Sequence, residues 1–114
     1  MTSITTKADA ESALDDLTTL FKDLSSLLQQ ETTLVHAGRV RKAAEIERTK
    51  KDLAGKLYTL GERLRANAKF ILQSVPERCG ALKSAQEELR AVLQRNMIVL
   101  ATAHAVSEGI VRRL

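Results

Sequence analysis

The stretch LDDLTTLFKDLSSLLQQETTLV, residues 14–35, decides the fold class of this chain. Its apolar residues recur at spacings of three and four, which is the repeat of a coiled-coil helix. A second line of leucines runs beside the first, so the apolar stripe is wide enough to contact more than one helix. The first line contains Leu14, Leu17, Phe21, Leu24, Leu28 and Val35, and the second contains Leu20, Leu27 and Leu34. We therefore predict a long helix over about residues 7–36.

Both ends of this helix carry recognisable signals. Thr5 or Thr6 can cap its start, and the acidic residues of the first turns favour the helix dipole. Gly38 can adopt the left-handed conformation that ends many helices. A second helix is therefore predicted to begin near residue 39.

The rest of the chain keeps helical spacing, with one interruption. The segment 39–73 has an apolar seam made of Ala43, Ile46, Leu53, Leu57, Leu60, Leu64 and Ile71. A turn is predicted over residues 74–80, because the residue before Pro76 is disfavoured in helical geometry and proline suits the first turn of a helix. A third helix follows over about residues 76–113. The sequence thus predicts one all-α domain over residues 1–114, an antiparallel helical hairpin or coiled-coil-like bundle with a third, C-terminal helix.

Charge is divided unevenly along the 114 residues. Residues 1–38 carry two Lys against six Asp or Glu, whereas residues 39–72 carry ten Lys or Arg against four Asp or Glu. Opposite charges suit neighbouring antiparallel helices. The basic run 39–51 is interrupted by Glu45 and Glu47 and contains no aromatic residue for base stacking. We interpret it as a solvated helix face and predict no nucleic-acid partner.

The sequence contains few residues suited to catalysis or metal binding. His104 and Glu108, four positions apart, have a spacing that could in principle bind a metal, but two ligands are too few for a site. Adjacent carboxylates such as Asp15 and Asp16 point about 100° apart on a helix and share a proton poorly. No glycine-rich phosphate loop is present. We predict that the protein is not an enzyme and has no cofactor and no metal.

Localisation is also predicted from absent features. The N-terminal stretch lacks the basic and apolar blocks of a signal peptide, and no apolar run approaches the roughly 20 residues of a membrane span. The single cysteine, Cys79, fits a reducing compartment. We predict a cytoplasmic protein that is not inserted in a membrane.

Several polar residues fall in the apolar seams, where leucine would stabilise more. They are Glu31, Lys50, Asn67, Gln86 and Asn96. Residues of this kind commonly fix the register of packed helices at a cost in stability. If residues 39–73 and 76–113 fold back on each other, Asn67 and Gln86 lie at one level, and we predict a hydrogen bond between their side chains.

The stretch NMIVL, residues 96–100, has four consecutive apolar residues, more than one helix face can bury. We expect Asn96 and Leu100 to face the hairpin, with Asn96 setting register. Ile98 and Val99 are then left for a partner, together with two more residues off the principal seam, Val92 and Val106. Excess apolar surface on one helix is typical of helix-in-groove recognition. Burial by homodimerisation is the alternative.

Residues 14–112 resemble the FlgN-type flagellar export chaperones. The resemblance is carried by the Leu-Leu-x-x-Glu pattern at 27–31, by the rhythm of Lys50, Leu53, Leu57 and Leu60, and by the segment LQRNMIVLATA at 93–103. In that last segment Asn96 and Leu100 stand near the places of the family's Asn-Gly-x-Leu pattern, and Met97 replaces the glycine.

The resemblance implies a cytoplasmic chaperone that binds the C-terminal helical regions of flagellar hook–filament junction proteins and delivers them to the flagellar type III export apparatus. It implies partners at the export gate and ATPase, but the tyrosine that some members use there has no counterpart after Tyr58. With the off-seam residues, the predicted protein-binding set is Leu93, Asn96, Met97, Ile98, Val99, Leu100, Ala103, Val106, Ile110 and Val111. The alternative function is a structural coiled-coil adaptor or a self-associating helical bundle.

Overall fold

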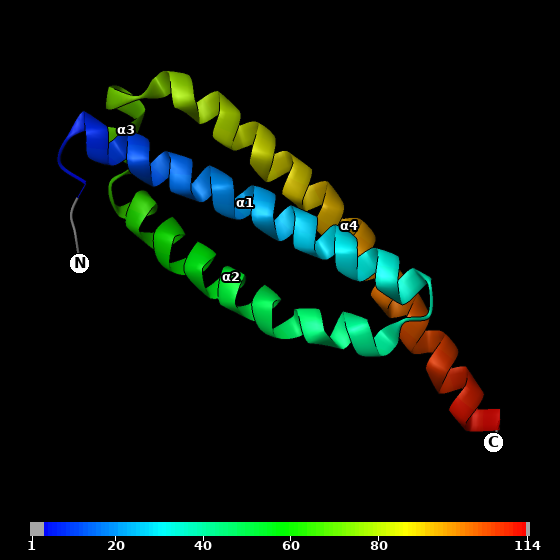
Figure 1. Cartoon of the computed structure of the whole chain (residues 1–114). Helices are drawn as coiled ribbons and strands as arrows, with labels where there is room; N and C mark the ends of the chain where they lie inside the picture. Colours follow the sequence, from blue (N-terminus) through cyan, green and yellow to red (C-terminus); the bar gives the residue numbers. More distant parts are fainter. Residues whose placement is uncertain (1–3, 114) are drawn as a thin grey trace.

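The computed structural model describes residues 4–113, and Figure 1 shows them as an elongated bundle of helices. The four helices are α1 (Lys7–His36), α2 (Val40–Ala66), α3 (Ala68–Ser74) and α4 (Pro76–Arg113), and the described residues form no strand. The all-α prediction is confirmed. No helix within residues 4–113 has an apolar stretch long enough to cross a membrane.

The first helix, α1, is the centre of the bundle. It packs against α2 on one side and α4 on the other (Figure 1), whereas no Cα atoms of α2 and α4 approach within 8 Å among the described residues. The bundle measures 62 × 26 × 19 Å. The wide apolar stripe of α1 is therefore explained, because this one helix has to cover two neighbours.

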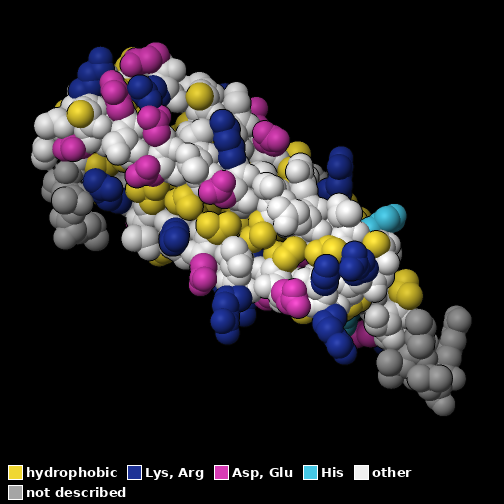
Figure 2. All heavy atoms as spheres, viewed as in Figure 1, with side chains coloured by type: hydrophobic (Ala, Val, Ile, Leu, Met, Phe, Trp, Pro, Cys, Tyr) yellow, Lys and Arg dark blue, Asp and Glu magenta, His cyan; other side chains and the backbone are white. Residues whose placement is uncertain are grey.

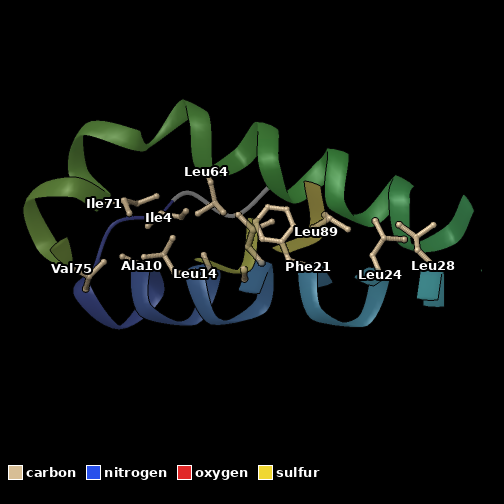
Figure 3. Packing of buried hydrophobic residues seen from close by; sticks show 13 residues of the cluster. Ile4, Ala10, Leu14, Phe21, Leu24, Leu28, Leu64, Ile71, Val75 and Leu89 are labelled. Atoms are coloured by element: carbon tan, nitrogen blue, oxygen red, sulfur yellow. The ribbon is translucent and has the colours of Figure 1, made fainter. Parts of the chain in front are cut away.

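The core lies along the inner face of α1. Figure 3 shows that the side chains of Leu14, Phe21, Leu24 and Leu28 project from α1 toward residues of the other helices. The buried residues that meet them are Leu64 of α2, Ile71 of α3, Val75, and Ala85 and Leu89 of α4. Each fully buried leucine contributes roughly 1.5–3 kcal/mol relative to an exposed one. Most of the core stability thus comes from residues packed on α1.

Both predicted ends of α1 are confirmed. Oγ1 of Thr6 accepts a hydrogen bond of 3.1 Å from the backbone N–H of Asp9, which satisfies one donor of the first turn. At the other end, Gly38 has a φ of 77°, and the backbone N–H of Arg39 donates to the carbonyl of Leu34 at 2.8 Å. This arrangement is a Schellman motif, which reverses the chain into α2.

The segment predicted as one helix over 39–73 is two helices, divided at Asn67. Nδ2 of Asn67 donates to the carbonyl of Arg63 at 2.8 Å, and short polar side chains that bond nearby backbone favour helix ends over helix interiors. The predicted hydrogen bond between Asn67 and Gln86 is wrong. α2 and α4 lie on different sides of α1, and Gln86 is exposed.

Candidate functional site

An apolar groove lies where α4 passes the turn between α1 and α2. It has a volume of about 530 Å³. One wall consists of Val35, His36, Gly38 and Val40, and the other of Ile98, Val99, Thr102, Ala103, Val106 and Ser107. Val40, Ile98 and Val106 are 64%, 60% and 58% exposed. We call this feature the α4 groove.

The groove follows from the lengths of the helices. α1 ends at His36 and the chain turns back at Gly38, but α4 continues beyond this turn, as Figure 1 shows. The last turns of α4 therefore extend past the end of α1. Among the described residues, their apolar side chains line a hollow together with Val35 and His36 at the end of α1, Gly38 of the turn and the first residue of α2, Val40.

A buried polar cluster fixes α4 at the edge of this groove. Asn96 of α4 is 2% exposed, and its Nδ2 donates to Oε1 of Glu31 at 2.8 Å and to Oγ1 of Thr32 at 3.1 Å. Nδ2 also lies 3.3 Å from the carbonyl oxygen of Leu28. These contacts join α4 to α1 two residues before Ile98, the first groove residue of α4.

Lys50 of α2 completes the cluster from the other side of α1. Its Nζ lies 3.2 Å from both carboxylate oxygens of Glu31 and 3.0 Å from Oε2 of Glu47. Burial alone lowers the pKa of Lys50, but the hydrogen bonds and charges of Glu47 and Glu31 outweigh it, so the pKa is raised. The buried Glu31 carboxylate thus bridges all three long helices, as the expected register role requires.

The structure brings together only part of the predicted binding set. Four of its members, Ile98, Val99, Ala103 and Val106, line the α4 groove. Asn96 is buried beneath the groove edge and Leu100 is half-buried, as expected for residues that face the hairpin. The side chains of Ile110 and Val111 lie outside the described residues.

Leu93 and Met97 are exposed but do not line the groove. Leu93 is 41% exposed, whereas the neighbouring Val92, expected to lie off the seam, packs against the core cluster. The line of α4 that faces α1 is Ala85, Leu89, Val92 and Asn96, at spacings of four and three. Leu93, a member of the predicted binding set, is therefore turned away from α1, because the buried amide of Asn96 sets the rotation of α4.

Sequence reasoning missed the opposite wall of the groove. The heptad pattern places Val35 in the seam of the first helix and gives no role to Val40. The sequence does contain a signal for this wall, which is a valine on each side of the Gly38 turn. A tight turn brings the residues before and after it together at one end of the bundle. His36, next to Val35, also lines this wall.

The remaining candidate groups form ordinary surface contacts. Nε2 of His104 lies 2.9 Å from Oε1 of Glu108, and Glu108 is also 3.8 Å from Arg112. Within residues 4–113, no three His, Cys, Asp or Glu side chains are grouped so as to hold a metal ion. Cys79 is half-buried, with Sγ 3.7 Å from the carbonyl of Val75. The α4 groove is the candidate site because four members of the predicted binding set line it.

No family model, no curated protein and no solved structure matches this chain. A functional conclusion therefore rests on the groove and on the sequence pattern. The walls of the groove are mostly valine, isoleucine and alanine, with His36 as their one titratable side chain. Such a surface is suited to binding an apolar helix face.

Proposed function

We propose that this protein is a cytoplasmic export chaperone of the FlgN type, which holds a C-terminal helix of a flagellar hook–filament junction protein in the α4 groove. The observation that carries the proposal is the exposure of Ile98 and Val106 on one wall and Val40 on the other. The sequence pattern of residues 14–112 supplies the identity of the partner. On this proposal the protein is a binding protein without catalysis, which delivers its cargo to the export gate and ATPase.

The size of the groove is adequate for reversible binding. A partner helix that covers about 400 Å² of apolar surface gains on the order of 10 kcal/mol before costs. Ordering a flexible partner and losing its freedom of motion offset much of this gain. The expected dissociation constant is therefore micromolar to nanomolar, which suits a chaperone that must release its cargo.

Two neighbouring residues on α4 allow a matched test. Ile98 and Met97 are both 60% exposed, but only Ile98 lines the groove. The experiment is size-exclusion chromatography of the purified chain with each hook–filament junction protein, followed by titration calorimetry. Wild type and Met97→Asp should co-elute with the cargo, and Ile98→Asp should not.

Each other outcome argues against the proposal. If wild type binds neither junction protein, the chaperone assignment is rejected and the structural adaptor becomes the better description. If Ile98→Asp and Met97→Asp weaken binding equally, cargo is held elsewhere on the surface. Circular dichroism should show equal helicity for the three proteins, because both substituted side chains project into solvent.

A further inference from the structure

A second apolar surface lies on the other side of α1, along its seam with α2. Figure 2 shows apolar side chains in a stripe between these two helices, and residues of both helices line a trough of about 840 Å³ along this seam. Leu20 of α1 and Leu60 of α2 line the trough, and both are only half-buried. Gly55 of α2 also lines the trough, and a Cβ atom added there would meet nothing within 4 Å. The trough shares no residue with the α4 groove.

The two walls of this trough differ in net charge, because α1 contributes Asp16, whereas α2 contributes Lys51, Lys56 and Arg63 against Asp52. On α1, the leucine stands between two carboxylates, Asp16 four residues before it and Asp23 three residues after it. On α2, Leu60 stands between two cations, Lys56 four residues before it and Arg63 three residues after it. Because residues three and four apart share one helix face, each wall is a ridge of charge, leucine and charge.

We propose that a second copy of this chain covers the trough and forms a two-fold dimer through α1 and α2. A two-fold axis parallel to the helices places α1 of one copy over α2 of the other. Each acidic ridge then meets a basic ridge, and each apolar wall meets an apolar wall. A surface with two walls of opposite charge is self-complementary in this arrangement, which is what a two-fold interface requires.

The register of the helices supports these contacts. Glu31 pairs with Lys50, and Leu20 lines the same trough as Leu60, so Asp16 lies near the level of Arg63, and Asp23 near that of Lys56. A two-fold axis parallel to the helices keeps every residue at its own level. Asp16 therefore faces Arg63 of the second copy, and Asp23 faces its Lys56.

The apolar part of α1 also favours a helical partner over a small ligand. The line of Leu20, Leu27 and Leu34 repeats every seven residues, and all three are half-buried and lie outside the main core cluster. A heptad line with one uncovered edge is the seam of a coiled-coil contact. The dimer leaves the α4 groove of each copy free for cargo.

Charge reversal on each wall tests the proposal. Sedimentation equilibrium should find wild type dimeric at micromolar concentration. Asp16→Lys/Asp23→Lys makes both walls basic, and Lys56→Glu/Arg63→Glu makes both acidic, so each double variant should dimerise about tenfold more weakly or worse. An equimolar mixture of the two variants should form a heterodimer, because every wall then meets its opposite.

The mixture separates a charge-matched dimer from a simple loss of folding. Circular dichroism of each variant reports the fold, and Asp16→Lys/Asp23→Lys changes only exposed side chains. A monomeric wild type at 100 μM, which is about the weak end of specific association, overturns the proposal. So does a dimer that persists in both variants, or a mixture that stays monomeric. None of these outcomes depends on whether cargo binds the α4 groove.

Discussion

The side-chain amide of Asn96 donates a hydrogen bond of 2.8 Å to Oε1 of Glu31, which joins α4 to α1 inside the bundle. Both residues are nearly inaccessible to solvent, at 2% and 3% exposure. A buried donor and acceptor tolerate little displacement, because an unpaired buried polar group is costly. This pair therefore sets the rotation of α4, and with it the side on which Ile98 and Val106 emerge.

Asn96→Ala should lower the free energy of unfolding by about 2–3 kcal/mol, since it leaves the buried Glu31 carboxylate with one donor fewer and opens a small cavity. Urea denaturation followed by circular dichroism measures the change. The control is Gln94→Ala on the exposed side of α4, which should stay within about 0.5 kcal/mol of wild type. Equal losses in the two variants would show that the amide is not a structural anchor.

Alkaline pH should weaken the bundle through Lys50. Its pKa is raised in the folded protein, so the stabilisation it provides is present below the unfolded lysine value of about 10.4 and is lost as pH rises through the folded pKa. We expect Glu31→Gln to lose less stability than wild type between pH 9 and pH 11.5, roughly the range over which lysines titrate. Urea midpoints at the two pH values give the comparison, and identical losses would contradict it.

Alanine substitution of two leucines one turn apart on α4 should lower the free energy of unfolding by very different amounts. Leu89 is buried against α1, so Leu89→Ala should cost about 2–4 kcal/mol, as for other core leucines. Leu93 is 41% exposed, so Leu93→Ala should cost less than about 1 kcal/mol. Thermal or urea unfolding of the two variants checks the rotation of α4 directly. A reversed order of costs would mean that Leu93 faces α1 in place of Leu89.

Substitution by alanine should change the stability of the protein in opposite directions at two of its glycines. Gly38 has a φ of 77°, where a Cβ atom is strained, so Gly38→Ala should destabilise by roughly 1 kcal/mol. Gly80 lies inside α4, and a Cβ atom there meets nothing within 4 Å, so Gly80→Ala should stabilise by about 0.5–1 kcal/mol. Differential scanning calorimetry of both variants measures the two shifts. A stabilising Gly38→Ala would mean that the turn tolerates another backbone conformation.

Prediction from sequence succeeded where the signal is local. The cap at Thr6 and the turn at Gly38 follow from backbone chemistry within a few residues, and both are present in the structure. Glu31, Lys50 and Asn96 interrupt apolar seams in the sequence, and in the structure they meet in one cluster in which Glu31 and Asn96 are buried and Lys50 is half-buried. Their mutual contact was not predicted, since spacing along one helix does not say which neighbours face it.

The sequence predictions that are wrong concern which helices pack together. The antiparallel pairing of 39–73 with 76–113 placed Asn67 opposite Gln86, but short connections do not require consecutive helices to touch. The wide stripe of α1 already indicated a helix with two neighbours, and this was the better guide. For the candidate site, the predicted set contains four of the ten residues that line the α4 groove, from Ile98 to Val106, and it lacks the wall with Val35 and Val40.

By itself, the sequence determined that this chain forms long amphipathic helices with defined ends, because helical periodicity, caps and glycine turns act over a few residues. Only the tertiary structure decided that α1 lies between α2 and α4, and that Asn96 turns Leu93 outward and Ile98 toward the turn at Gly38. The physical reason is that a wide apolar stripe fits several partners nearly equally well. The choice among them depends on burying Glu31 and Asn96 against each other, with the half-buried Lys50 as the counter-charge, since a polar or charged group is costly to bury alone.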